Sequence, residues 1–411
     1  MKSKLLALFA VVILSSVLAG CSDSKSSSGE DDNTITVWAM GEEGKKLQDF
    51  SKNFEKENPD LKVEVQAIPW DTAHDKLLTA VASGNGPDVL QLGTTWVPEF
   101  AEAGALLDLT KYMDDHPSFA KDNYFDGSVT TMEYGDQVVG IPWYVDTRVL
   151  YYRKDLLKEA GYDEAPKTWD ELKDAASKLA DRGEKDFGLD IDRNDQITPF
   201  IFAWENGYKA NLDKNELNFD TPEFKEAIQY YISYFKEGIS QKQEGVDIVQ
   251  AFKNGTKPMF FSGPWMINII NDQAPDLKGK WATAVMPKKK SNTSSMGGAN
   301  FSVFHTSDNV EGALKYISYM TKVDTQMDWL KASNTLPSRK EAWDKPIMKE
   351  DPMYATFGEQ LKDTNPGLQT PQFERIAQEF LSSIERVVVG GADLDKELEQ
   401  FNEKAQSLLN K

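Results

Sequence analysis

The chain has 411 residues and a formal net charge of −20 at pH 7, from 66 acidic and 46 basic side chains. A negative charge of this size repels nucleic acid and anionic lipid headgroups, so we expect no nucleic acid as a partner. At about 150 residues per domain the length predicts two or three α/β units, with ample material for a buried core.

Residues 1–20 have the pattern of a cleaved secretion signal, because lysines precede an apolar run that is too short to span a membrane. The tetrapeptide Leu-Ala-Gly-Cys at 18–21 resembles the bacterial lipobox, which implies cleavage before Cys21 and a lipid anchor on its sulfur. Cys21 is the only cysteine, and its place at the cleavage point disfavours the alternative of an ordinary secretory peptide. The polar stretch 21–33 is then predicted to be a flexible tether.

The chain after the tether alternates strand and helix patterns. Residues 35–39, 61–68 and 89–92 are predicted as strands, and 42–57 and 71–83 as helices that end at Asn-Pro and Gly-Asn-Gly-Pro. This β-α-β-α-β order predicts a parallel sheet.

The same alternation continues in the second half. Residues 145–152 are apolar enough for one buried strand, and a capping box at Thr168 opens a helix. Two helices with apolar stripes, separated by Gly390-Gly391, end the chain. We therefore expect an α/β protein with two lobes.

Several segments, in this order along the chain, match one known family: 86–92, 100–109, 140–157, 166–172, 252–255, 261–265, 286–288, 297–298 and 336–339. They resemble the extracellular solute-binding proteins of bacterial carbohydrate ABC transporters, a maltose-binding-protein-like family. The resemblance implies a two-lobed, periplasmic-binding-protein-like (type II) fold, with hinge crossings and a ligand cleft between the lobes. It implies an N-terminal lobe of residues 34–144 plus 297–340 and a C-terminal lobe of 145–296 plus 341–411.

A sugar presents hydroxyl groups and a face of C–H groups, so its site needs flat aromatic rings with carboxylates, amides and guanidinium groups beside them. In open α/β sheets such residues lie at the carboxyl ends of strands. The candidate ligand-binding residues are Trp38, Glu42, Glu43, Trp96, Trp143, Asp146, Arg148, Trp204, Trp265, Gly298 and Phe373. Trp265 and Phe373 correspond to aromatic platforms of the family, and Gly298 to its hinge. The alternative for the aromatic residues is that they pack in the core. The alternative for the carboxylates is that they are helix-end or surface charges. Trp70 and Tyr144 are not among the predicted ligand-binding residues.

Two other patterns predict no further chemistry. Asp190, Asp192 and Asn194 have the spacing of a calcium loop, but Asp195 replaces its turn glycine and Ile201 its bidentate glutamate. The three histidines are far apart and have no catalytic or metal-binding motif around them. We expect no metal, cofactor or catalytic residue.

The predicted function is a monomeric, lipid-anchored receptor that captures a disaccharide or oligosaccharide and delivers it to the permease subunits of an ABC importer. It would work on the outer face of the cytoplasmic membrane, or in the periplasm of a host with two membranes. Two alternatives remain open: the same fold binding another polar solute, such as a glycerol phosphate or polyamine, and a secreted glycoside hydrolase.

Overall fold

The computed structural model describes residues 33–242 and 247–410. The predicted signal peptide, Cys21 and nearly all of the tether lie outside the described residues. Within them, none of the helices has both the length and the apolar character needed to cross a membrane.

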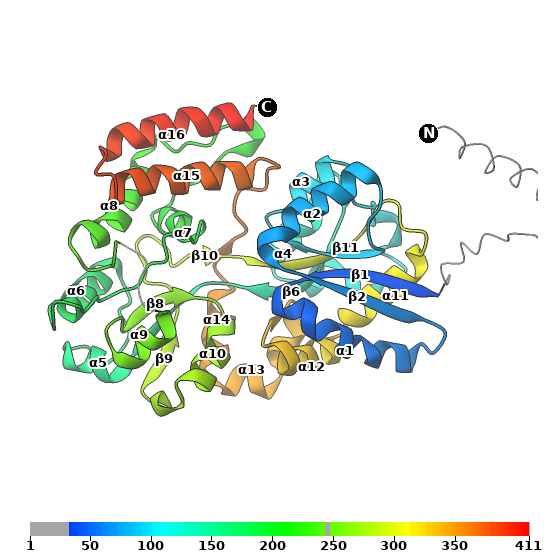
Figure 1. The fold of residues 1–411 in the computed structure, drawn as a ribbon, viewed down its shortest axis with the longest axis horizontal. Coiled ribbons are helices and arrows are strands. Elements are labelled where there is room, and N and C mark those ends of the chain that lie inside the picture. The colour runs from blue at the N-terminus through cyan, green and yellow to red at the C-terminus, as the bar shows by residue number, and fades with distance from the viewer. Residues whose placement is uncertain (1–32, 243–246, 411) are drawn as a thin grey trace, which may run out of the picture. The chain divides into compact units, whose positions relative to one another are not determined.

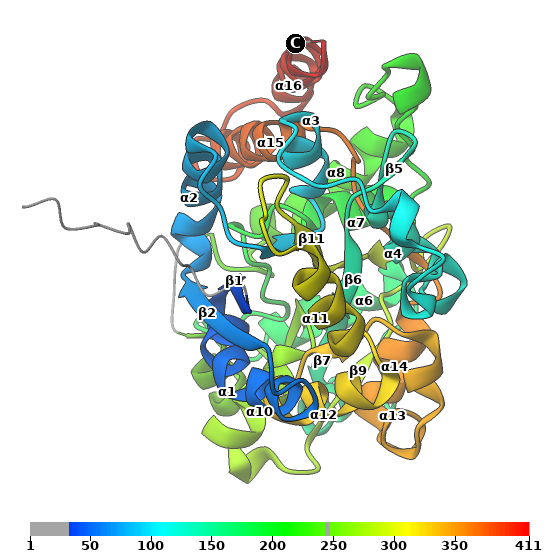
Figure 2. The same ribbon diagram turned by 90° about the vertical axis from the view of Figure 1, so that its right-hand side faces the viewer.

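A six-stranded sheet organises the first lobe, in the order β12-β6-β11-β3-β1-β2 (Figure 1). Its strands are β1 (Thr34–Met40), β2 (Lys62–Ile68), β3 (Val89–Gly93), β6 (Ile141–Asp146), β11 (Gly297–Val303) and β12 (Leu336–Pro337). β1 pairs in parallel with both β2 and β3, which confirms the predicted parallel arrangement. β11, from much later in the chain, lies between β3 and β6 and is antiparallel to both (Figure 2).

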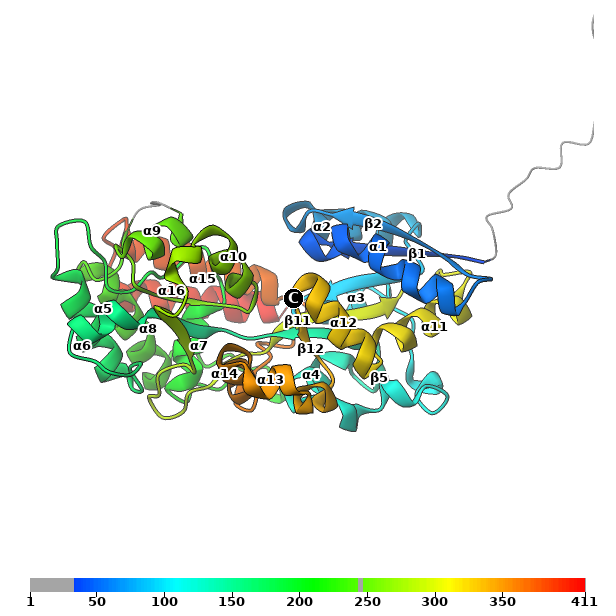
Figure 3. The same cartoon turned by 90° about the horizontal axis from the view of Figure 1, so that it is seen from below.

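Helices cover both faces of this sheet because side chains of a strand alternate between its faces. On β1, Ile35, Val37 and Ala39 pack with one set of helices and Met40 with the other. The first set is α1 (Gly41–Glu57), α11 (Val310–Met320) and α12 (Val323–Ser333) (Figure 3). The second set is α2 (Trp70–Ser83) and α3 (Val97–Glu102).

A three-stranded antiparallel sheet organises the second lobe, with β7 (Val149–Arg153) between β8 (Met259–Ser262) and β9 (Trp281–Ala284). The largest core of this lobe is formed by side chains from helices, many of them aromatic. The rings of Phe380 and Phe401, for example, stack with their centroids 4.6 Å apart. Helices of this lobe are α5 (Lys154–Glu159), α6 (Trp169–Ala180), α7 (Thr198–Glu205), α8 (Pro222–Lys236), α9 (Ile248–Asn254), α10 (Trp265–Gln273), α15 (Phe373–Val388) and α16 (Leu394–Leu409).

The chain passes between the two sheets at short, irregular segments. The prediction of one strand over 145–152 is wrong, because β6 ends at Asp146 in one sheet and β7 begins at Val149 in the other. Thr147 and Arg148 make this crossing. A second crossing runs through β10 (Ser294–Ser295), which pairs with β13 (Thr364–Asn365). Between β12 and β13 lie α13 (Pro346–Glu350) and α14 (Pro352–Gln360); α4 (Asp126–Met132) and the hairpin β4 (Glu133–Tyr134)–β5 (Gln137–Val138) precede β6.

Candidate functional site

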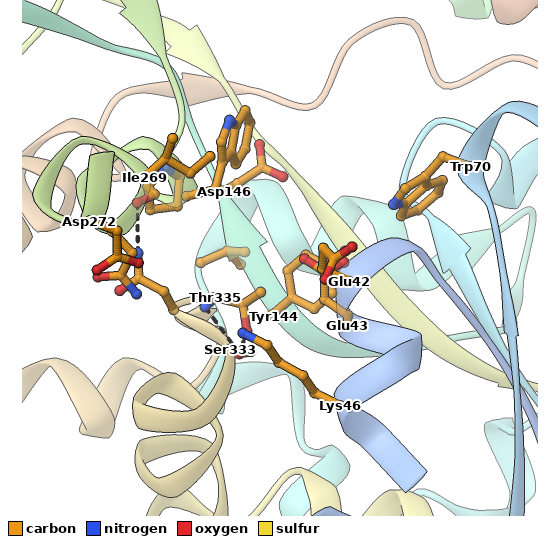
Figure 4. Close-up of a pocket in the computed structure, with 15 residues that line it drawn as sticks. Glu42, Glu43, Lys46, Trp70, Tyr144, Asp146, Ile269, Asp272, Ser333 and Thr335 are labelled. Atoms are coloured by element: carbon orange, nitrogen blue, oxygen red, sulfur yellow. Dashed lines mark hydrogen bonds between the residues drawn. The ribbon is translucent and has the colours of Figure 1, made fainter. Parts of the chain in front are cut away.

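A cleft with two chambers lies where the crossings leave the six-stranded sheet. The large chamber has a volume of about 640 Å³, and its walls come from α1, the end of β6, α10 and residues 333–335. Figure 4 shows Trp70 and the α1 side chains on one side of it, with Ile269 and Asp272 of α10 across from them. The small chamber, of about 290 Å³, is lined by Trp96, Arg148, Gln196 and Phe373 among others.

Trp265 is the first residue of α10 and presents its indole to the large chamber. Its side chain is 40% exposed, which is unusual for an indole held in a fixed position. The ring passes so close to Gly263 that a Cβ there would lie 2.1 Å from it. The guanidinium of Arg148 lies 4.8 Å from the ring centroid, in a cation–π contact. Glycine and arginine together therefore fix this indole.

Arg148 is itself held by two carboxylates. It donates to Asp146 and to Asp195, each at 3.2 Å. Asp195 also accepts from the backbone N–H of Ile197 at the start of α7, which ties the arginine to the second lobe. Burial raises the pKa of Asp146, and the positive charge of Arg148 opposes that rise. The ion pair between Asp146, the last residue of β6, and Arg148 thus fixes the start of the crossing.

Glu43 and Tyr144 supply further polar groups to the large chamber. Burial raises the pKa of Glu43, and the negative charge of Asp146 raises it further. Gln91 donates to the Tyr144 hydroxyl at 3.1 Å and accepts from the N–H of Met40 at 2.8 Å, so the phenol is fixed. The chamber therefore has carboxylates and a hydroxyl beside an indole, which suits a ligand rich in hydroxyl groups.

The small chamber contains three more of the predicted residues. Trp96 packs edge-on against Trp70, with ring centroids 5.4 Å apart. Gly298 has φ +122°, and a Cβ there would lie 2.2 Å from the carbonyl oxygen of Tyr144, so only glycine fits. Phe373 reaches the chamber wall, but it is only 1% exposed and packs mainly in the second-lobe core.

Of the remaining four predicted residues, three tryptophans line neither chamber and one glutamate lines the large chamber. Trp143 is fully buried and stacks on Phe301 with centroids 4.2 Å apart, because its position on β6 faces the core rather than the cleft. Trp204 is buried in the second-lobe core on α7. Trp38 is half-buried under Lys76 and lines neither chamber. Glu42 does line the large chamber, although it is highly exposed and paired with Lys45. The structure therefore does not bring Trp143, Trp204 or Trp38 to the cleft.

Trp70 and Tyr144, which are outside the predicted set, line both chambers, and Asp272 and Asn334, also outside it, line the large one. Trp70 could have been found, because it follows Pro69 directly at the end of a predicted strand. Asn334 and Asp272 had no such signal, since both lie at the ends of helices whose orientation only the fold reveals.

The described part of the chain has no group of three or more His, Cys, Asp or Glu side chains placed to hold a metal ion. The acidic loop that resembled a calcium site uses its carboxylates differently. Asp190 pairs with Lys257 at 2.6 Å, and Asp192 accepts from the N–H of Asn194 at 2.9 Å.

A third crossing follows β12, which belongs to the first-lobe sheet, and leads to α15 in the second-lobe core. Two lobes, three crossings and a cleft between the lobes define a type II, periplasmic-binding-protein-like fold. Residues 38–327 match the family described as bacterial extracellular solute-binding protein, and the chain belongs to this family.

The chain is 32% identical to the sugar-binding protein MalE of Xanthomonas citri, whose structure superposes with a TM-score of 0.86 over 92% of this chain and 97% of that one. It is 26% identical to the arabinooligosaccharide-binding protein of Halalkalibacterium halodurans, over 77% of this chain and 73% of the relative. It is 24% identical to the galactooligosaccharide-binding protein of Bacillus subtilis, over 98% of this chain and 96% of the relative.

Proposed function

We propose that this protein is the substrate-binding component of an ABC importer and captures a disaccharide or oligosaccharide in its cleft. The observation that carries the proposal is the exposed, rigidly held Trp265, which faces carboxylates and a tyrosine hydroxyl across a chamber of about 640 Å³. Membership of the solute-binding family and the sugar ligands named for its relatives support the same conclusion.

Several contacts must act together in this site. Stacking one sugar face hides about 60 Å² of apolar surface and stabilises the complex by about 1.5 kcal/mol. A micromolar complex requires about 8 kcal/mol, so one indole is not enough. Glu43, Asp146 and Tyr144 would supply hydrogen bonds to hydroxyl groups, and closing the lobes would bring Trp265 and the α1 carboxylates onto one ligand.

A neutral ligand fits the charges of the cleft better than an anionic one. Glu42, Glu43, Asp146 and Asp272 line the large chamber with Lys46, while Arg148 is already paired with two carboxylates. A phosphate group would meet this negative charge without a free guanidinium to bind it. We therefore disfavour a glycerol phosphate. A hydrolase is disfavoured because the family is one of binding proteins.

We further propose that residues 34–144 and 297–340 move as one lobe and 145–296 and 341–411 as the other. The crossing at Thr147–Arg148 and the glycines at 297 and 298 are the hinge candidates. The φ of +122° at Gly298 supports this, because such backbone tolerates no side chain.

Delivery to permease subunits needs the receptor to stay near the membrane, so we propose that Cys21 carries the lipid and that the monomer works outside the cytoplasm. The test is Cys21→Ser expressed in the native host. The variant should appear in the culture medium of a host with one membrane, or in the soluble periplasmic fraction of a host with two, while the wild type stays with the membranes. Equal membrane retention of both would contradict the anchor.

The test of the central proposal is calorimetric titration of the mature protein with neutral oligosaccharides. Trp265→Ala should weaken binding of any sugar that binds by about tenfold or more, since one stacking surface is lost. Leu78→Ala is the matched control, because Leu78 is an apolar residue on α2 that is nearly as exposed as Trp265 and lines neither chamber. This variant should bind the sugar as the wild type does. Release of new reducing ends would overturn the receptor function, and unchanged affinity of the Trp265 variant would overturn the site.

A further inference from the structure

The two chambers of the cleft meet at three residues, Trp70, Tyr144 and Asp146, each of which lines both chambers. We call these three residues the waist. Trp265 lines only the large chamber, whereas Trp96 lines only the small one. A ligand in contact with both of those tryptophans has to pass the waist.

Trp70 is held firmly at the waist although it is 38% exposed. A Cβ at Gly41 would lie 2.6 Å from its indole nitrogen, and a Cβ at Gly93 would lie 3.7 Å from its far edge. Trp96 packs against it edge-on, and His74 in turn supports Trp96 with ring centroids 5.2 Å apart. An exposed indole that glycines and a second indole fix in place is a preformed apolar platform for a ligand.

The polar groups of the waist have hydrogen-bonding capacity left for a ligand. Asp146 accepts from Arg148 through Oδ1, which leaves Oδ2 as an acceptor for a ligand. Tyr144 accepts from Gln91, so the proton of its own hydroxyl remains to be donated. A sugar ring on Trp70 would therefore meet an acceptor and a donor at its edge.

The volumes of the chambers indicate the length of the ligand. The large chamber, about 640 Å³, is within the range of about 300–1,000 Å³ that holds a ligand of disaccharide size. The small chamber, about 290 Å³, has room for about one more ring.

We propose that Trp70 is a ligand-binding residue and that the ligand is an oligosaccharide of about three or more rings, threaded through the waist. One ring stacks on Trp70, and its neighbours occupy the chambers of Trp265 and Trp96. This inference rests on the proposed function, since it assumes a sugar in the cleft.

The test is calorimetry with malto-, arabino- and galacto-oligosaccharides of two to five rings. In the series that binds, the wild type should gain about tenfold in affinity on addition of the third ring, and little beyond the ring that fills the second chamber. Trp70→Ala should lose that gain, so that the disaccharide and the trisaccharide bind equally. Trp70→Phe, which keeps a smaller aromatic face, should retain part of the gain and shows that the site still folds.

Leu78→Ala lies on the same helix with the same 38% exposure and should keep the full dependence on length. A wild type that binds disaccharides as tightly as trisaccharides would overturn the inference while the proposed function stands. So would a Trp70→Ala variant that retains the gain or weakens all lengths equally. Absence of binding to every series would overturn the proposed function and this inference with it.

Discussion

Two glycines and one arginine set the geometry of the cleft. Gly263 lets the Trp265 ring lie against the backbone, and Gly298 lets two strands approach at the crossing. Arg148 links the indole to Asp146 and Asp195. The aromatic residues that a ligand would touch are therefore fixed by neighbours that need not touch it, which is how a site stays preorganised.

Gly298→Ala should lower the free energy of unfolding by about 1–3 kcal/mol from backbone strain alone, with more from the clash at 2.2 Å. Urea denaturation measures the loss. Gly104→Ala is the control, because that residue also has a positive φ, +68°, but has open space where its Cβ would go. If both variants lose the same stability, the close approach to Tyr144 is unimportant.

Glu43→Gln should stabilise the protein at pH 7. Burial and Asp146 raise the pKa of Glu43, so the folded state holds its proton up to a higher pH than the unfolded chain does. Ionisation therefore costs stability as the pH rises above the unfolded pKa of about 4.3, and the cost is complete above the raised pKa. The melting temperature of the variant should exceed that of the wild type at pH 7 and approach it at pH 4.

Glu42→Gln is the control, because the pKa of the neighbouring Glu42 is shifted in the opposite direction. Its hydrogen bond to Lys45 lowers the pKa of Glu42, so ionisation favours the folded state and that small benefit disappears on acidification. Glu42→Gln should bring no gain in melting temperature at pH 7. An equal gain in both variants would mean that general charge reduction, rather than burial of Glu43, is the cause.

At the scale of elements, the C-terminal helix α16 packs on α15 and the second-lobe core and lines neither chamber, whereas α15 reaches the small chamber through Phe373. Asp393 caps the start of α16, and its carboxylate accepts from the N–H of Lys396 at 3.0 Å. Such a cap satisfies one of the free N–H groups at a helix start. Its loss should therefore affect stability and leave sugar binding intact.

Asp393→Ala should lower the free energy of unfolding by about 1 kcal/mol without a change in sugar affinity. Asp395→Ala removes an acidic residue from the same first turn but no capping bond, and should cost only a few tenths of that. Chemical denaturation and calorimetry measure the two effects separately. A change in affinity with Asp393→Ala would show that α16 is coupled to the cleft.

Apolar periodicity in the sequence predicts the elements better than it predicts the direction in which their side chains point. The first three strands and the helices between them follow from apolar periodicity, and their parallel pairing is as predicted. Trp143 and Trp265 look alike in sequence, yet one stacks in the core and the other faces the cleft. The difference depends on β11 and α12, which pack on Trp143 from positions more than 150 residues later. No local pattern contains that information.

At the scale of the whole molecule, a cleft whose walls belong to two lobes should close on its ligand. The large chamber takes Glu43 from α1 and Trp265 from α10, so a ligand that bonds to both lowers the free energy of the closed arrangement. Arg148 stands at the crossing and its ion pairs span Asp146 of β6 and Asp195 before α7. Arg148 therefore ties the two lobes together at the crossing by ion pairs as well as through the backbone.

Small-angle scattering of the mature protein should therefore show a smaller radius of gyration at saturating oligosaccharide than without it. Trp265→Ala should show the same decrease, but only at a sugar concentration about tenfold higher, because the variant loses affinity and keeps the hinge. Bovine serum albumin in the same sugar solutions controls for the change in solvent contrast. Calorimetric binding with an unchanged radius would mean that the cleft is rigid, and the affinity would then have to come from a preformed site alone.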